Sequence, residues 1–463
     1  MLKTDYLIVG AGALGMSFAD QLLTETDSKI LFVDKHHLPG GHWNNAYSFV
    51  CLHQPSAFYG VGSRDLGSNR IDETGVNRGY YELASGAEIQ TYFERLMRER
   101  FLPSGRVEYF PMCEYTDNGS FTSLLSGETQ SVEVRRKVVD ATFFNTSVPS
   151  TRTPKYEIAD GVKLIAPNSL PTEVAAHSRY TIIGGGKTAM DVAMWLLQNG
   201  AKPGSIRWVV PRDSWLINRE TTQPGDAFHN RFIGAKAAQL ESCANATSIA
   251  GLFDLLEQSG QLLRIDKSIT PTMYHGATIA QAEIDALGTI RNVIRKGHVQ
   301  QIGLEKMILD DGEVISEAND LYIDCTASAI VRRPTRPIFA GNSITLQMIR
   351  AGLFCFSAAV IAHLESTTDD DAQKNHLCPP LQAPDADTDW LLLMKAETSI
   401  LKRWSTDASL RQWISQHRLG GANLRSKLSD SSDPQSQAIR ARIKAASSQA
   451  SENLDRLISQ IGN

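Results

Sequence analysis

A strand-like apolar run at residues 6–9 leads into a glycine-rich turn and then into a helical pattern. The turn has the sequence Gly10-Ala-Gly12-Ala-Leu-Gly15, and apolar residues recur at helical spacing after it. In such a unit the first glycine permits a tight turn, the second lets the backbone approach a pyrophosphate, and the third allows close helix–strand packing. The pattern predicts a dinucleotide-binding unit whose phosphates lie at the start of the helix.

A second apolar run, residues 29–33, follows this helix and ends in Asp34. Asp34 therefore stands about twenty residues after the glycine turn, where dinucleotide-binding units carry an acidic residue. A carboxylate there accepts hydrogen bonds from a ribose 2′-OH and repels a 2′-phosphate. We expect the first unit to hold FAD or NAD rather than NADP.

The same pattern recurs in the middle of the chain, with apolar residues 180–183, a glycine turn, a helix and a second apolar run at residues 205–210. At this strand end Arg212 takes the place of an acid. A guanidinium can pair with a 2′-phosphate through two hydrogen bonds. NADP(H) is therefore favoured here. Arg212 and Lys187 can also be explained as solvated surface charges. The candidate residues of this unit are Gly184, Gly186, Lys187, Thr188 and Arg212.

Shorter patterns predict how the two units are connected. A helix at residues 88–100 precedes strands around residues 107–110, 121–125, 132–134 and 138–142, and a hairpin turn is expected at Asp310-Asp-Gly312. A strand over residues 321–326 resembles the one at residues 138–142, so we expect the chain to leave its first domain at one and re-enter it at the other. Helices are expected at residues 389–404, 410–418 and 437–461, with the last one docked on the body.

These elements predict an α/β fold. It would consist of an FAD-binding Rossmann-like domain (residues 1–149 and 321–385), an inserted NADP-binding Rossmann-like domain (residues 150–320) and a helical C-terminal extension (residues 386–463).

Composition narrows the possible partners and location. The 463 residues carry a formal net charge of −5 without a long basic run, which argues against nucleic acid as the main partner. The apolar stretch at residues 352–364 is too short to cross a bilayer, and no secretory leader pattern precedes the first strand. We expect a cytoplasmic protein without a membrane span; a homo-oligomer remains open.

Six cysteines are scattered along the chain without a Cys-x-x-Cys pair. The sequence therefore lacks the redox-active dithiol on which flavoprotein disulfide reductases depend. His36, His37, His42, Cys51 and His53 crowd one stretch, but their spacing matches no common ligand pattern, so no metal site is expected.

With these motifs the chain resembles the two-dinucleotide-domain flavoproteins that include flavin-containing, Baeyer–Villiger and N-hydroxylating monooxygenases. Three further segments carry the resemblance: Gly40-Gly41-His-Trp43, Leu52-His53-Gln54-Pro-Ser56, and Ile344-Thr-Leu-Gln347. The Phe-x-Gly-x-x-x-His fingerprint of the first two groups is missing from residues 143–171. The chain therefore resembles a divergent branch, and the substrate rules of the family do not transfer.

The resemblance implies FAD at the first unit and NADPH at the second. The implied FAD-binding residues are Gly10, Gly12, Gly15, Asp34, Lys35, Gly41, Trp43 and Gln347. Residues 36–84 have little helical periodicity and are long enough to cover an active site. Within them we expect His53, Gln54 and Ser56 to contact flavin or substrate, with His53 changing protonation near neutral pH. A structural role for each of these three residues remains open.

The activity implied is that of an FAD-containing, NADPH-dependent single-component monooxygenase. It would insert one oxygen atom of O2 into a small organic substrate through a C4a-(hydro)peroxyflavin. Two alternatives remain open: an NADPH-dependent flavin reductase or oxidase without oxygen insertion, and a non-catalytic FAD-binding partner protein.

Overall fold

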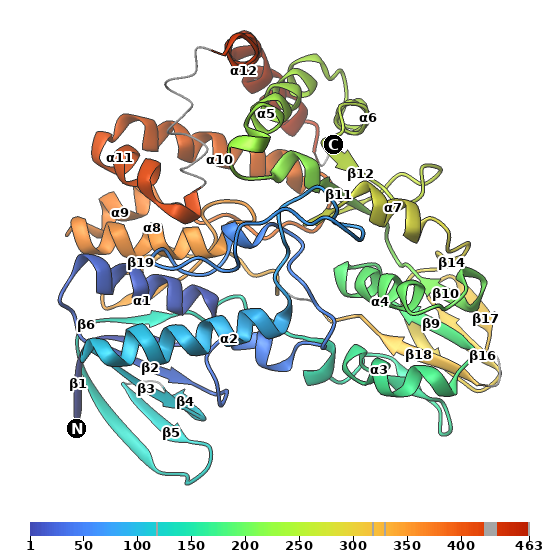
Figure 1. The fold of residues 1–463 in the computed structure, drawn as a ribbon, viewed down its shortest axis with the longest axis horizontal. Coiled ribbons are helices and arrows are strands. Elements are labelled where there is room, and N and C mark those ends of the chain that lie inside the picture. Colours follow the sequence, from blue (N-terminus) through green and yellow to red (C-terminus); the bar gives the residue numbers. More distant parts are fainter. Residues whose placement is uncertain (117–118, 317–318, 328–329, 421–432, 462–463) are drawn as a thin grey trace.

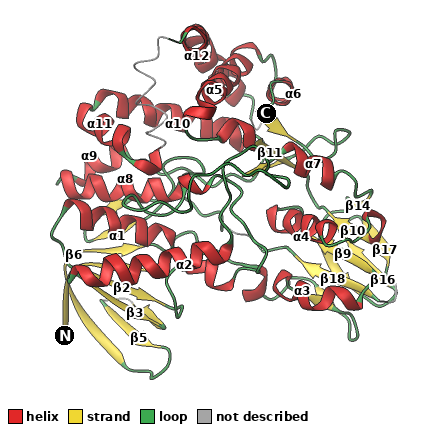
Figure 2. Cartoon of the chain, in the orientation of Figure 1, coloured by secondary structure: helices red, strands yellow, loops and turns green. Residues whose placement is uncertain are grey.

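The computed structural model describes residues 1–463 except residues 117–118, 317–318, 328–329, 421–432 and 462–463. Two separate sheets, each with helices around it, lie side by side in Figure 1, and a group of helices lies above them. Long loops run between these parts, as the green segments of Figure 2 show. The predicted α/β fold class is confirmed.

The first sheet carries the first glycine turn. Its strands are β1 (Leu2–Val9), β2 (Ile30–Asp34), β3 (Val107–Pro111), β4 (Cys113–Thr116), β5 (Ser120–Ser123), β6 (Thr129–Asp140), β19 (Phe339–Ala340) and β20 (Ser343–Thr345). The order is β19-β20-β6-β1-β2-β3, with β20, β6, β1, β2 and β3 parallel. The meander predicted before residue 142 is confirmed, although β6 is one long strand where two were expected.

Helices cover this sheet. They are α1 (Ala13–Glu25), α2 (Gly86–Leu96), α8 (Phe354–Thr367) and α9 (Asp371–Leu377). Every residue of α8 from Cys355 to Glu365 is buried, because this helix is apolar on all sides and packs on α1. The helix α2 begins at a capping box in which Ser85 and Glu88 each accept a hydrogen bond from the other's backbone N–H.

The second sheet carries the second glycine turn. Its strands, in the order β14-β10-β9-β18-β8, are all parallel. They are β8 (Leu164–Ile165), β9 (Arg179–Ile183), β10 (Ile206–Val209), β14 (Asn292–Ile294) and β18 (Asp320–Asp324), and the helices beside them are α3 (Leu170–Glu173), α4 (Lys187–Gln198) and α7 (Gln281–Leu287).

The position of β18 corrects one prediction. The strand expected over residues 321–326 to re-enter the first domain pairs with β9 instead, from Asp320 opposite Arg179 to Asp324 opposite Ile183. The strand that returns to the first sheet is β20, which pairs with β6. Both are buried parallel strands, and hydrophobic pattern alone does not say which sheet such a strand joins.

A small antiparallel hairpin lies beside the second sheet. It is formed by β16 (Lys306–Leu309) and β17 (Gly312–Ile315), which join β15 (Val299–Ile302) and β7 (Glu157–Ile158) in a four-stranded sheet. The hairpin turn predicted at residues 310–312 is confirmed.

Residues 214–280 make an excursion from the second unit. They contain β11 (Ser214–Asn218), α5 (His229–Asn245), α6 (Ile249–Gln258), β12 (Leu262–Leu263) and β13 (Met273–Ile279). This excursion packs against the C-terminal helices α10 (Asp389–Thr406) and α12 (Pro434–Ile458), with α12 lying along α5. The remaining C-terminal helix, α11 (Ala408–Gln416), packs on α8 through Trp413. Phe253 stacks on Trp215 and meets Trp390 edge-on. The three predicted C-terminal helices and the docking of the last one are confirmed.

Residues 36–84 form a covering segment between the two units. Of regular helix they contain two short 3₁₀ turns, Gly41–Asn45 and Ser56–Phe58. Arg418, from the C-terminal helical region, donates hydrogen bonds to the carbonyl oxygens of Ala57, Tyr59 and Val61. The C-terminal extension therefore holds the covering segment in place.

Candidate functional site

The first glycine turn lies at the carboxyl end of β1. Gly10 has a φ of +100°, and a Cβ on Gly15 would overlap the carbonyl oxygen of Gly10, so both positions require glycine. The turn packs against the end of β6, where Cγ2 of Thr142 lies 3.1 Å from the Cβ position of Gly10. Within the described chain no side chain caps the N-terminus of α1. Its free N–H groups can therefore bind a pyrophosphate.

Asp34 ends β2 beside this turn and is buried. Its Oδ2 accepts a hydrogen bond from the backbone N–H of Ala11 at 2.6 Å, and its Oδ1 accepts one from the backbone N–H of His36 at 2.7 Å. A carboxylate offers about four acceptor positions, so Asp34 keeps capacity for a ribose hydroxyl. Lys35 follows it as an exposed side chain.

The Gly40-Gly41-His-Trp43 motif meets the first turn directly. The N–H of Gly40 donates to the carbonyl oxygen of Ala11 at 2.8 Å. A Cβ on Gly41, whose φ is +61°, would lie 3.1 Å from the Cα of Gly12. Trp43 packs against the core of this unit and donates its indole N–H to the hydroxyl of Tyr59 at 2.8 Å. The structure thus brings Gly41 to the turn, as the sequence predicts.

The second glycine turn repeats the first in backbone construction. Gly184 has a φ of +125°, and a Cβ there would lie 2.8 Å from the carbonyl oxygen of Cys325, just after β18. Gly186 is the N-cap of α4, where no described side chain caps the helix. Nothing lies within 4 Å of the Cβ position of Gly186. The start of α4 therefore has open space in front of free N–H groups.

Lys187 and Thr188 form the first turn of α4. Lys187 makes an ion pair with Asp191, one helical turn later, and lies 3.8 Å from Glu283. Asp191 also accepts a hydrogen bond from the hydroxyl of Tyr47 at 2.7 Å. Tyr47 belongs to the covering segment, which therefore contacts the second unit as well as the first.

Arg212 follows β10 and lies beside the second turn. Its carbonyl oxygen is so close that a Cβ on Gly185 would lie 2.9 Å from it. Its guanidinium donates two hydrogen bonds to Asp385, at 2.7 and 3.1 Å. The hydrogen bond from Arg212 lowers the pKa of Asp385 to about 2. Arg212 thus lies at the turn, its role toward a 2′-phosphate stays a prediction, and its acidic partner was not foreseen.

The structure corrects the expectation for His53. Its Nδ1 accepts the backbone N–H of Thr278 at 3.1 Å. Burial and the positive charges of Lys187 and Arg219 lower the pKa of His53 to about 3. The prediction that His53 changes protonation near neutral pH is therefore wrong, because the sequence did not show these surroundings.

The other two candidates of this stretch differ in burial. The Ser56 hydroxyl is buried, donates to the carbonyl oxygen of Glu82 at 2.9 Å and accepts the N–H of Ala84 at 2.8 Å. These bonds fix the covering segment and engage the hydroxyl. Gln54 is half-buried beside His53.

Arg219 is a site residue that sequence analysis missed. It is 1% exposed and pairs with Glu283 at 2.6 Å. It also donates to the carbonyl oxygen of His53 and to Oδ1 of Asn77, each at 3.2 Å. Arg219 thus joins the excursion, α7 and the covering segment at one buried point. An isolated arginine outside any motif gives no sequence signal for this role.

Gln347 lies in the first unit just after β20 and is buried. Its Nε2 donates to the carbonyl oxygen of Arg336 at 2.7 Å, and its Oε1 accepts the N–H of the same residue at 3.2 Å. The amide is therefore engaged by the chain itself, and contact with FAD through this side chain stays a prediction.

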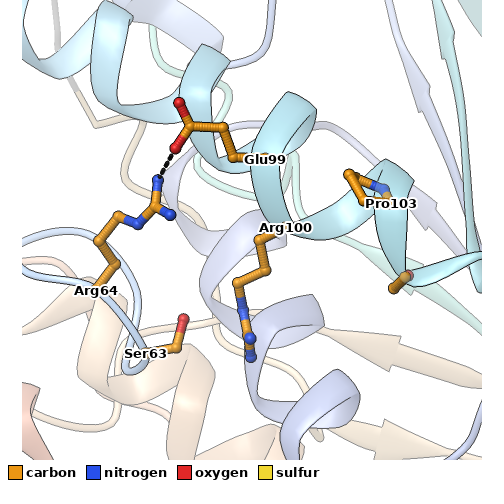
Figure 3. A pocket seen from close by; sticks show the side chains of 6 residues that line it. Ser63, Arg64, Glu99, Arg100 and Pro103 are labelled. Carbon is orange, nitrogen blue, oxygen red and sulfur yellow. Dashed lines mark hydrogen bonds and ion pairs between the residues drawn. The ribbon is translucent and has the colours of Figure 1, made fainter.

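Two surface cavities are lined by residues of the covering segment and of the chain that follows it up to residue 104. One, of about 460 Å³, is lined by Ser63, Arg64, Glu99, Arg100, Pro103 and Ser104, with Arg64 and Glu99 paired across it (Figure 3). The other, of about 500 Å³, lies between the covering segment and α2 and includes Ser56 in its lining. Neither cavity is lined by the glycine turns.

Comparison with known proteins identifies the family to which the chain belongs. A family model described as an NAD(P)-binding Rossmann-like domain matches residues 8–62. An uncharacterized protein of Mycobacterium tuberculosis is 47% identical over 418 residues, covering 90% of this chain and 78% of the relative, and one of Mycobacterium bovis matches equally. The chain belongs to the family of these mycobacterial proteins.

The fold of this family is that of the two-dinucleotide-domain flavoprotein monooxygenases. An open crystal structure of cyclohexanone monooxygenase matches with a TM-score of 0.50 and 14% identity, covering 98% of this chain and 99% of that one. The resemblance inferred from the glycine turns is confirmed at the level of the fold.

Two further observations concern the described residues alone. None of their helices combines the length and the apolar character needed to cross a membrane. Among the same residues, no group of three or more His, Cys, Asp and Glu side chains is arranged to hold a metal ion.

Proposed function

We propose that this family member is an FAD-containing, NADPH-dependent monooxygenase that inserts one atom of O2 into a small organic molecule. One observation carries the proposal: two glycine turns of the same construction, on separate parallel sheets, are joined by one covering segment. Gly41 of this segment contacts the first turn, and its Tyr47 binds Asp191 beside the second. A substrate site enclosed between two nucleotides is the arrangement that hydride transfer followed by oxygen activation needs.

The residues of the first unit fit FAD. The uncapped start of α1 can bind the pyrophosphate, and Asp34 has acceptor capacity for the ribose. Bound FAD would supply hydride acceptance from NADPH and, once reduced, reaction with O2. The chain itself would bind and orient the cofactor and shield it from water.

The residues of the second unit fit NADPH. The open space at Gly186, in front of the uncapped start of α4, suits a diphosphate. Arg212 stands where a 2′-phosphate would be recognised. Lys187 is paired with Asp191 and would orient the nucleotide with a remaining N–H of its ammonium group.

His53 would act as a neutral hydrogen-bond donor. Because its Nδ1 accepts a backbone N–H and its pKa lies at about 3, the neutral ring carries its proton on Nε2. This N–H can donate to a bound substrate or cofactor without a change of charge. Arg219 holds the backbone of His53 and would act as a positioning residue.

The cysteines support monooxygenation over disulfide reduction. All six are free, and five of them are buried. Burial raises the pKa of the Cys243 and Cys355 thiols to about 11. Cys51 is exposed at the surface, but partial desolvation of its thiol and the negative charge of Asp191 raise its pKa as well. A dithiol that exchanges electrons with flavin needs an accessible thiolate, which these surroundings disfavour.

A rapid-mixing experiment tests the proposal on the full-length protein loaded with FAD. NADPH is expected to reduce the flavin anaerobically, and mixing with oxygenated buffer should then give a transient absorbance distinct from oxidised and reduced flavin. The measurement is repeated with amine, sulfide and ketone substrates present. Direct return to oxidised flavin with stoichiometric peroxide in every case would instead identify an oxidase or reductase. Failure of NADPH to reduce the flavin would contradict both enzymatic functions.

A further inference from the structure

The side chain of Arg212 meets an acid from a distant part of the chain. Asp385 lies 173 residues later, just before α10, and receives both guanidinium hydrogen bonds. His275, in β13, approaches the same carboxylate, with Nε2 at 3.0 Å from Oδ1. Three segments thus converge beside the second glycine turn: the end of β10, β13 and the start of the C-terminal extension.

We propose that Asp385 occupies the 2′-phosphate subsite of the second unit and is a determinant of coenzyme specificity. This inference rests on the proposed binding of NADPH at this turn. A carboxylate and a phosphate both accept the two parallel N–H groups of a guanidinium. In this structure Asp385 uses the donors that a 2′-phosphate would use.

Hydrogen bonds hold the backbone of Asp385 in place, so its carboxylate can rotate away from Arg212 without a movement of the backbone. The N–H of Asp385 donates to Oδ2 of Asp389 at 2.8 Å, and its carbonyl oxygen accepts the N–H of Tyr274 at 3.0 Å. Only one short side chain has to rotate to free Arg212 and His275. Both side chains then face the space in which a phosphate would lie.

The negative charge of Asp385 determines whether this residue strengthens or weakens the binding of a 2′-phosphorylated nucleotide. A 2′-phosphate entering the subsite displaces the carboxylate from Arg212 and meets its negative charge nearby, and like charges at short range oppose binding. A nucleotide that ends in a free 2′-OH meets no such cost. Asp385 therefore reduces the preference for phosphorylated nucleotides that Arg212 alone would create.

Calorimetric binding of two redox-inactive probes tests the inference. The probes are 2′,5′-ADP, which carries the 2′-phosphate, and 5′-AMP, which lacks it, each added to the FAD-loaded full-length protein and to Asp385→Asn. The substitution should tighten 2′,5′-ADP by about tenfold and change 5′-AMP by less than about twofold. The matched control is Asp387→Asn, two residues away, whose acid binds the N–H of Thr388; it should leave both affinities unchanged.

Every other pattern overturns the inference. Unchanged or weaker binding of 2′,5′-ADP to Asp385→Asn would show that Asp385 does not compete for the subsite. Weaker binding of 5′-AMP would instead identify Asp385 as a ribose ligand. If the wild type binds neither probe, the nucleotide site at the second turn fails, and the proposed function fails with it. His275→Gln provides a second variant, expected to weaken 2′,5′-ADP and not 5′-AMP.

Discussion

The two glycine turns share one backbone design, yet different side chains surround them. Each turn packs against the end of the next parallel strand and opens a helix without a side-chain cap. Beside the first turn a buried acid, Asp34, is bound by the turn's own backbone. Beside the second an arginine, Arg212, is bound by an acid from the C-terminal extension. In the proposed function the backbone would hold a diphosphate at both turns, and the neighbouring side chains would distinguish one nucleotide from the other.

The largest effects are expected when a methyl group is added to one glycine of each turn. At one glycine it enters open space, and at the other it overlaps the backbone. In Gly186→Ala the new methyl group enters the open space before α4, so the fold should persist while NADPH affinity falls more than about a hundredfold. In Gly15→Ala the methyl group overlaps the carbonyl oxygen of Gly10, so bound FAD and native stability should both be lost. Flavin content, thermal melting and calorimetry check these outcomes.

The matched control for both variants is Gly204→Ala, at a glycine with nothing within 4 Å of its Cβ position. It should retain FAD, melting temperature and NADPH affinity. Tight NADPH binding to Gly186→Ala would contradict the assignment of the second turn.

The next effect concerns the buried ion pair between Arg219 in the excursion and Glu283 in α7. Arg219→Met removes the close partner of buried Glu283 and leaves only Lys187, 3.8 Å away, which should cost about 3 kcal/mol of the free energy of unfolding. Adding Glu283→Gln should recover part of this loss, because the orphaned charge is then removed. Urea unfolding measures both. Arg231→Met, at an exposed arginine paired with Glu220, should change stability by less than about 1 kcal/mol.

Arg212→Ala tests whether the second turn distinguishes NADPH from NADH through this arginine. Losing a charge-assisted pair with the 2′-phosphate should weaken NADPH by about 10- to 100-fold and NADH by less than about threefold. Titration of each reduced nucleotide against the FAD-loaded protein measures this ratio. Equal losses for both nucleotides would remove Arg212 from 2′-phosphate recognition.

The last effect is a pH dependence at His53. Its folded pKa of about 3 lies below the ordinary value of 6.5, so the unfolded chain binds a proton first as the pH falls. The free energy of unfolding therefore decreases from pH 6.5 towards pH 3, and His53→Gln should lose less stability over this window. Urea unfolding at several pH values tests this. Parallel curves for the two proteins would contradict the buried, neutral state of His53.

The sequence predicts the features that depend on short stretches of chain. Glycine spacing identifies both turns, and Asp34 and Arg212 follow because they stand at fixed distances from those turns. The C-terminal helices follow from caps and periodicity. In each case the physical cause lies within a few turns of helix or one strand, so no distant segment is needed to recognise it.

The features that escaped prediction depend on distant segments. The strand that returns to the first sheet is β20 and not β18. A hydrophobic pattern does not specify which of two sheets a buried strand joins. The partners of Arg212 and Arg219, Asp385 and Glu283, become visible only when the fold brings distant segments together. The lowered pKa of His53 likewise depends on its burial by distant segments and on charges from α4 and the excursion.

The packing of α12 on α5 has a consequence for synthesis on the ribosome. Asn453 donates a hydrogen bond to the carbonyl oxygen of Cys243, 210 residues earlier. At about 5–20 residues per second, α5 waits roughly 10–40 s for its partner to be translated. For the first part of that interval Phe253 also remains without its ring contact to Trp390. Apolar surface of the excursion therefore stays exposed on the nascent chain until the C-terminal helices emerge.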